Sequence, residues 1–238
     1  MGLDIGGNLI DSNIVRRYPT TKTPVGGLML HLDAYVPESY PGSGATFYDL
    51  SGNNNNFSIT GATWNSAGFF SFNGSSYMAN TSLSVPGLTN VASCIVWLKP
   101  DAGQTGDGTY NGLFSYGPRA CNSQTFLMSM NNSYGPTMAK WCDDFTSPTA
   151  TMNTSTWWQY TLVVNGSSVN FYLNDYGAGS GTLAAANNFG VGTAAIGSTD
   201  VYGRIFKGSI ASVKFYNRVL SSTEIANNYN IERLKFGI

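Results

Sequence analysis

The sequence predicts an all-β protein: a two-sheet antiparallel sandwich with one short helix near the C-terminus and an extended N-terminal arm. First, only 11% of the 238 residues are charged, whereas 13% are aromatic and 28 are glycine, a balance that suits strands and tight turns. Second, short apolar runs alternate with turn sequences along most of the chain. Third, a helix-capping signal occurs only near the end. All-β chains of this length commonly form one domain.

Residues 1–27 contain two prolines, two glycine pairs and no periodic apolar pattern, so we expect an extended arm. Its apolar residues have no partners within the segment and are expected to dock on another protein; they are Ile5, Leu9, Ile10, Ile14 and Val15. The chain begins without a basic region followed by an apolar one, so we expect no signal peptide and synthesis in the cytoplasm. No apolar run is long enough for a membrane span, and no basic patch indicates nucleic-acid binding.

The first strand is predicted in GLMLHLDA, where Leu28, Leu30 and Leu32 alternate with Met29, His31 and Asp33. His31, the one histidine, lies opposite the leucines and is expected to be an exposed strand residue. A loop rich in Gly, Ser and Asn follows and contains Asp49 and Asn53. GFFSFNGSSYMAN then predicts two short strands around an Asn-Gly turn, and ASCIVWLKP predicts a buried strand.

Residues 101–153 are predicted to be irregular, and loops of this length often carry function. Cys121 and Cys142 lie there and could face each other across a hairpin, although a disulfide is not expected in a reducing compartment. The clearest hairpin follows, with strands at 157–164 and 169–173 around a turn that begins Asn165-Gly166.

The closing stretch, GSIASVKFYNRVLSSTEIANNYN, predicts a strand followed directly by a helix. Ser221 and Glu224 have the spacing of a capping box, and Leu220 and Ile225 that of a hydrophobic staple. The helix is therefore expected to run from Ser222 to about residue 229, at one edge or end of the sandwich.

This ending resembles the C-terminal signature of laminin-G-like, concanavalin A-like jelly rolls, G-x-I-D-x-V-x-x-Y-N-R-x-L-S-x-x-E-I. DLSGNNNN, FNGSSYM, IVWLKP and WWQYTLVVNGSSVNFYLND occur in the family's order, so the resemblance covers about residues 27–230. It implies a jelly-roll sandwich at 28–230, between the arm at 1–27 and a tail at 231–238. Openings such as GLMLHLDA…YPGSG…YDLSGN are similar to those of tailed-phage structural proteins.

Related domains often hold calcium, and Ala211 stands where the signature has aspartate. Calcium needs six to eight oxygen ligands, so the loss of one carboxylate disfavours the site, and we expect no cofactor. Asp49 and Asn53 are the remaining weak candidates for ligands. The favoured interpretation is that Asp49 and Ser51 shape a turn by bonding local amides.

Catalysis is not expected from these residues. A retaining glycosidase needs two carboxyl groups close together, and the three glutamates, Glu38, Glu224 and Glu232, have no acidic residue two positions away. Sugar binding stays open, because aromatic side chains occur in or beside the long irregular region. The candidate ligand-binding residues are Tyr110, Tyr116, Tyr134 and Trp141.

The resemblance favours a non-enzymatic virion protein of a tailed phage, either capsid decoration or a tail or fibre accessory. It would dock through its arm on other virion proteins and form a homo-oligomer on the particle. The alternative is a glycan-binding lectin module for host attachment, and a polysaccharide hydrolase is a weaker third hypothesis.

Overall fold

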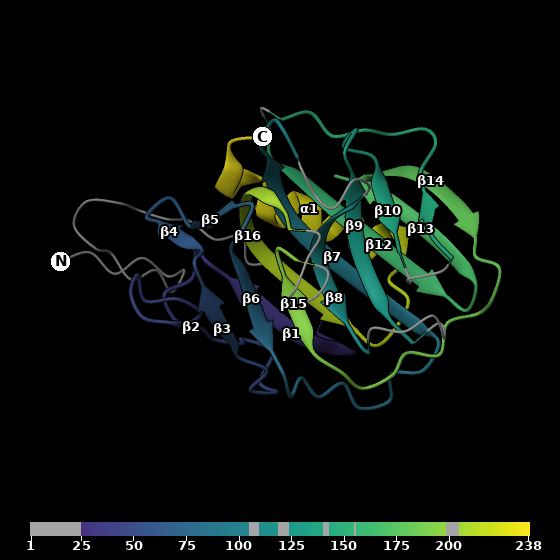
Figure 1. Cartoon of the computed structure of the whole chain (residues 1–238), viewed down its shortest axis with the longest axis horizontal. Coiled ribbons are helices and arrows are strands. Elements are labelled where there is room, and N and C mark those ends of the chain that lie inside the picture. The colour runs from purple at the N-terminus through teal and green to yellow at the C-terminus, as the bar shows by residue number, and fades with distance from the viewer. Residues whose placement is uncertain (1–24, 105–109, 119–123, 140–142, 155, 199–204) are drawn as a thin grey trace, which may run out of the picture.

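Two antiparallel sheets of eight strands each form the part of the chain that the computed structural model describes, residues 25–104, 110–118, 124–139, 143–154, 156–198 and 205–238. The sheets pack face to face in a sandwich (Figure 1). This architecture confirms the predicted all-β jelly-roll class. No helix among the described residues is long and apolar enough to cross a membrane. The arm residues 1–24, with Ile5, Leu9, Ile10, Ile14 and Val15, lie outside the described residues, as do Cys121 and Cys142.

Sheet A carries the longest strands. Its order is β14 (Tyr176–Thr182), β13 (Ser168–Leu173), β12 (Trp158–Asn165), β7 (Val91–Pro100), β16 (Lys207–Tyr216), β5 (Phe69–Asn73) and β4 (Thr63–Asn65), with β1 (Leu28–Asp33) also paired to β16. Sheet B has the order β11 (Phe145–Thr146), β10 (Pro136–Met138), β9 (Phe126–Asn131), β8 (Tyr110–Tyr116), β15 (Ala194–Ile196), β6 (Tyr77–Asn80), β3 (Phe57–Thr60) and β2 (Thr46–Phe47).

The core lies between the sheets and is built by strand alternation. Leu30 and Leu32 of β1 are fully buried, as the alternating pattern predicts, and they pack in one cluster with Phe114 of sheet B. Phe215 of β16 reaches the same cluster, with its ring centroid 5.1 Å from those of Phe114 and Phe126.

The two predicted turns have different roles. Gly166 takes a positive φ of 62° at the tip of the β12–β13 hairpin, whose last pair is Asn165 with Ser168. The hairpin is confirmed, and the positive φ falls on the glycine alone. Asn73-Gly74 instead connects β5 of sheet A to β6 of sheet B, so this turn is a corner between the sheets.

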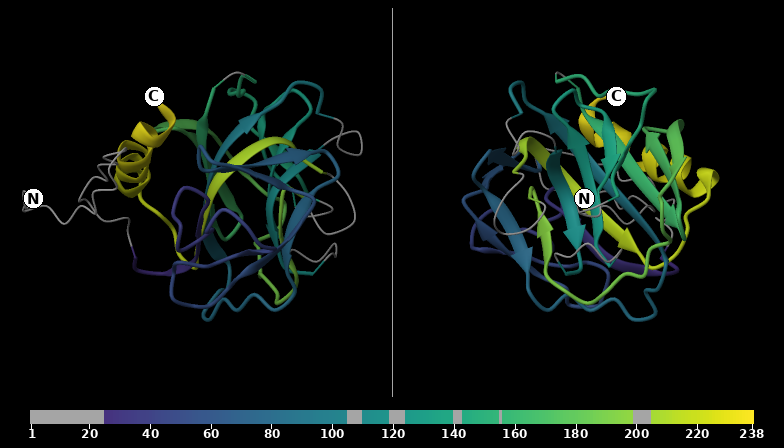
Figure 2. Two further views of the ribbon diagram at one scale, coloured as in Figure 1. Left: turned by 90° about the vertical axis from the view of Figure 1, so that its left-hand side faces the viewer. Right: turned by 45° about the vertical axis from the view of Figure 1, so that its right-hand side comes forward.

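The C-terminal helix α1 (Ser222–Glu232) and the 3₁₀ helix η1 (Arg233–Phe236) lie on the outer face of sheet A (Figure 2). The predicted place at an edge or end of the sandwich is therefore wrong. The ring of Phe236 stacks on Trp97 of β7 with centroids 4.4 Å apart, and Tyr229 stacks on the same indole at 5.8 Å. Residues 231–238, predicted as a separate tail, instead continue the helix and pack on the sheet.

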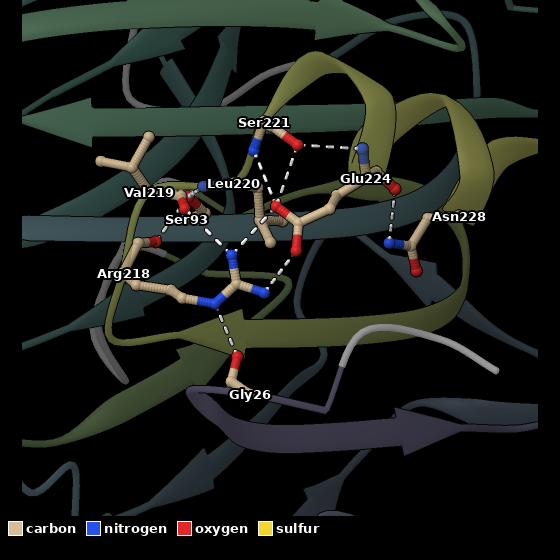
Figure 3. A network of polar contacts seen from close by, with 8 residues as sticks. All are labelled: Gly26, Ser93, Arg218, Val219, Leu220, Ser221, Glu224 and Asn228. Carbon is tan, nitrogen blue, oxygen red and sulfur yellow. Dashed lines mark hydrogen bonds and ion pairs between the residues drawn. The ribbon is translucent and has the colours of Figure 1, made fainter.

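The helix starts at a network of polar contacts that joins three segments (Figure 3). The predicted capping box is present: Ser221 Oγ accepts from Glu224 N at 3.2 Å, and the Glu224 carboxylate accepts from Ser221 N at 2.9 Å. Arg218 donates two bonds to that carboxylate, at 2.6 and 3.0 Å, and a third to Gly26 O at 2.6 Å. Ser93 Oγ links β7 to the backbone at Arg218 and Leu220. The residues of the closing signature thus hold the helix against the first strand.

Candidate functional site

The two outer faces of the sandwich differ. The helix covers much of the outer face of sheet A, whereas the strand register places a row of small side chains on the outer face of sheet B. The row runs through Thr46, Ser58, Ala79, Ala195 and Ser115. Ala195 and Ser115 are buried, whereas Ser58 is exposed and Thr46 and Ala79 are half-buried.

The open part of this surface is the β2–β3–β6 face, which we define as Thr46, Tyr48, Ser58, Thr60 and Tyr77. Tyr77 is half-buried and lies directly opposite the exposed Thr60 in the β3–β6 pairing. Tyr48 follows β2 two positions after Thr46, so strand alternation puts it on the same side, and its side chain is 45% exposed. The face therefore combines two phenol rings with three hydroxyl side chains.

This composition fits carbohydrate recognition. A tyrosine ring offers an apolar face for stacking and a polar tip for hydrogen bonding, and threonine and serine hydroxyls both donate and accept. From strand geometry the two rings are roughly 15 Å apart. That span suits an oligosaccharide better than one sugar ring. Tyr48 and Tyr77 are not among the tyrosines predicted from the sequence, although Tyr77 lies in a predicted strand, because alternation does not say which face of a sheet stays open.

The tyrosines chosen from the sequence do not form one site. Tyr116 points inward from β8, paired with Phe126, and only 2% of it is exposed. Its ring lies 6.0 Å from that of Phe215, and burial raises its pKa. The prediction that Tyr116 binds a ligand is therefore wrong, because the alternation of β8 puts it in the core. Trp141 lies outside the described residues.

Tyr110 and Tyr134 lie at one end of sheet B. Tyr110 begins β8 opposite Asn131, the last residue of β9, and is half-buried. Tyr134 follows in the β9–β10 turn with a positive φ of 63° and packs against the core. Both stay candidates at that end of the sheet, away from the β2–β3–β6 face.

The loop that holds Asp49 and Asn53 completes the free edge of β1. One Asp49 oxygen accepts from the backbone amides of His31 and Ser51, each at 2.9 Å, and the other accepts from Ser51 Oγ and Asn55 N. Asn53 Nδ2 donates to the backbone oxygens of β1. These side chains replace a neighbouring strand, in agreement with the favoured turn interpretation. Both Asp49 oxygens and Asn53 Nδ2 already have protein partners, so the loop offers a cation few free ligands.

His31 is not the exposed strand residue that the sequence predicts. It lies under the C-terminal segment, and its Nε2 is buried without a hydrogen-bond partner. Its ligand atoms and those of Asp33 and Glu232 lie within 4.8 Å of one another. However, Lys214 Nζ binds Glu232 at 2.5 Å and Lys235 Nζ binds Asp33 at 2.6 Å. Both carboxylates of this group are therefore already paired with an ammonium group.

The glutamates are not arranged for glycoside hydrolysis. Glu224 holds the helix cap, where the hydrogen-bonded Arg218 lowers the pKa of its carboxyl to about 2. Glu232 is buried under the helix, and Glu38 is exposed in a loop. These positions offer no acid and nucleophile that face a common open surface.

The chain belongs to a sequence family described as the concanavalin A-like lectin/glucanases superfamily, Laminin_G_3, which matches residues 72–226. The predicted resemblance to laminin-G-like jelly rolls is thereby confirmed. No curated protein matches the chain. The fold is shared with solved structures of low sequence identity.

A Trypanosoma rangeli sialidase in complex with sialic acid aligns with a TM-score of 0.67 and 14% identity, over 91% of this chain. This chain spans about a third of that protein's length, 35%. A second match is domain 4 of AbnA, an extracellular arabinanase from Geobacillus stearothermophilus, in complex with arabinotriose. It aligns with a TM-score of 0.61 and 20% identity, over 84% of this chain and 97% of that domain. The botulinum neurotoxin serotype D binding domain aligns at 0.62 and 14% identity, over 86% of this chain and 51% of that one. The chain thus has a lectin-like jelly-roll fold.

Proposed function

We propose that this chain is a non-enzymatic glycan-binding module and that the β2–β3–β6 face is its binding surface. The observation that carries the proposal is that the exposed Tyr48 and the half-buried Tyr77 lie among hydroxyl side chains on a sheet face. The arabinanase domain in complex with arabinotriose supports it, because that match covers nearly the whole of a domain rather than part of an enzyme. Glu224 and Glu232 are held in ion pairs and Glu38 lies alone in a loop, which favours binding without hydrolysis.

The test is binding of oligosaccharides in solution. We expect the chain to bind a glycan on an array with millimolar or stronger affinity, and calorimetry with that glycan to show at least a tenfold loss in Tyr77→Ala and in Tyr48→Ala. Tyr176→Ala is the matched control, since Tyr176 is 48% exposed but lies on β14 at the edge of sheet A. Equal loss in all three variants, or no binding by the parent chain, would reject the β2–β3–β6 face. Release of reducing sugar would reject the non-enzymatic role.

We further propose that the module works on the surface of a tailed-phage particle, as capsid decoration or a tail or fibre accessory, where glycan binding would serve host attachment. The motifs GLMLHLDA and YDLSGN support this setting, and in the structure they form one unit, since the 49–55 loop bonds along β1. Other virion proteins would then be its partners, bound through residues 1–24. This role does not depend on the tyrosines.

Particle incorporation tests this setting. Mass spectrometry of purified particles should find the chain at a copy number that follows the capsid lattice or the tail symmetry. Deletion of residues 1–24 should leave a folded sandwich that no longer joins particles. Incorporation of the truncated chain at the parent level would reject docking through this segment, and absence of the full chain from particles would reject the virion role.

A further inference from the structure

A layer of buried charges lies between sheet A and the C-terminal segment. His31 of β1 and Lys214 of β16 are direct cross-strand neighbours, and Glu232 at the end of α1 lies over them and binds Lys214. Asp33 binds Lys235, which also lies 3.8 Å from Glu232. Two carboxylates therefore face two ammonium groups. The charges of these four groups cancel, so the layer has no net charge as long as His31 is neutral.

This layer satisfies its polar groups incompletely. Two of its atoms, His31 Nε2 and Glu232 Oε2, are buried without a hydrogen-bond partner in the described part of the chain, and so is Nε1 of Trp97, which lies under Phe236. Such atoms lose their water on burial and gain nothing in exchange. These atoms oppose the docking of the C-terminal segment, and local opening is therefore expected there first.

The protonation state of His31 is coupled to this attachment. Burial lowers the pKa of His31 from 6.5 to about 4; Lys214 and Lys235 lower it as well, while Glu232 and Asp33 raise it. Three further groups contact this layer: the Tyr216 hydroxyl, which interacts with Glu232, the Asn228 amide oxygen, which accepts from Lys214, and the Asp49 carboxylate, which accepts from the His31 backbone amide. Once the segment leaves, His31 meets water and regains its ordinary pKa. The released state therefore binds the proton more tightly between pH 6.5 and 4.

We propose that residues 222–238 form a clasp that is docked at neutral pH and released by acid, before the sandwich unfolds. Protonated His31 places a third cation beside Lys214 and Lys235, against two carboxylates. Release moves that charge into water and uncovers Trp97 together with the apolar patch of Ile95 and Val163. This device is independent of the proposed glycan site, which lies on the other sheet.

Amide hydrogen exchange of the full chain, followed by mass spectrometry between pH 7 and pH 4, tests the clasp. After correction for the chemical exchange rate, protection of the C-terminal part of α1, residues 226–232, should fall about 100-fold over this range, while the β12–β13 hairpin stays protected. His31→Gln, which keeps a neutral polar side chain, should remove most of that fall. The matched variant Phe236→Ala should lower protection of the helix at every pH without changing its pH dependence.

Parallel loss of protection in helix and hairpin would overturn the proposal, as would an unchanged fall in His31→Gln. The parent chain gives an independent measurement, because it contains one histidine and its imidazole NMR signal needs no assignment. We expect that signal to titrate below 6.5, over the same pH range in which the helix loses protection. Titration at the ordinary value with a fully protected helix would also overturn the proposal.

Discussion

Arg218→Lys is the substitution that best separates charge from geometry at the helix junction. The guanidinium of Arg218 bonds Glu224 through two nitrogens, Gly26 O at 2.6 Å and Val219 O at 3.1 Å. Lysine keeps the charge and one contact with the carboxylate. It cannot reach all four acceptors, because its three donors share one nitrogen atom.

The expected cost follows from the bonds that lysine loses. Two hydrogen bonds to backbone oxygens disappear, and the paired contact with Glu224 becomes a single one. A hydrogen bond nets about 0.5–1.5 kcal/mol, and the Arg218 side chain is one-third exposed, at 33%, so the lower half of that range applies. We therefore expect the free energy of unfolding to fall by about 1–2 kcal/mol.

Urea unfolding, followed by tryptophan fluorescence, measures this change. The midpoint should move to lower urea with an unchanged slope, since the surface exposed on unfolding stays the same. Arg233→Lys is the control, because the Arg233 side chain donates to Ile238 O at 2.9 Å, near the chain end, and joins no such network. Two results would contradict this reasoning. One is an Arg218→Lys midpoint equal to that of the parent chain, and the other is an equal fall in the free energy of unfolding for Arg233→Lys.

Three further predictions concern the helix and the 49–55 loop. Ser221→Ala should lower the free energy of unfolding by about 1 kcal/mol, because Glu224 N loses its acceptor; an unchanged urea midpoint would contradict this. Lys214→Met should cost about 3–5 kcal/mol, because Glu232 loses its hydrogen-bonded partner and keeps only Lys235 at 3.8 Å. Adding Glu232→Gln should restore much of that stability in thermal unfolding; no recovery would contradict the pairing. EDTA should leave the melting temperature unchanged, because protein donors already fill the Asp49 carboxylate, and a fall of many degrees would reveal a bound cation.

The elements that the sequence predicts well are those fixed by local chemistry. The β12–β13 hairpin follows from an Asn-Gly pair between two apolar runs, and the start of α1 follows from Ser221 and Glu224. Both signals act over a few residues. The order of the family motifs along the chain then identifies the jelly roll.

The predictions that fail depend on contacts between distant segments. Alternation separates the two faces of β1, but it does not show that Asp33 is covered by Lys235, which is 202 positions later. Lys214 alternates with the apolar Val213 and Phe215 along β16, a position typical of an exposed polar face, yet it is fully buried. The prediction for Tyr116 fails for the same reason, because only the pairing of β8 with β9 and β15 shows which face of β8 lies in the core.

The buried charges under α1 are not explained by stability alone, since apolar residues of similar volume are often at least as stabilising in such places. Their position indicates that the start and the end of α1 are attached to the sheet by different kinds of contact. The start of α1 is held by the capping box and by Leu220 and Ile225, which pack with Ile95. The lowered pKa of Glu224, about 2, means that its ion pair with Arg218 is largely kept at pH 4 and is lost only nearer pH 2. Most of the attachment that depends on neutral His31 is already lost at pH 4. Acid should therefore loosen the segment from Glu232 and Phe236 toward Ser221, and amides of the last turn should lose protection at a higher pH than those of the first.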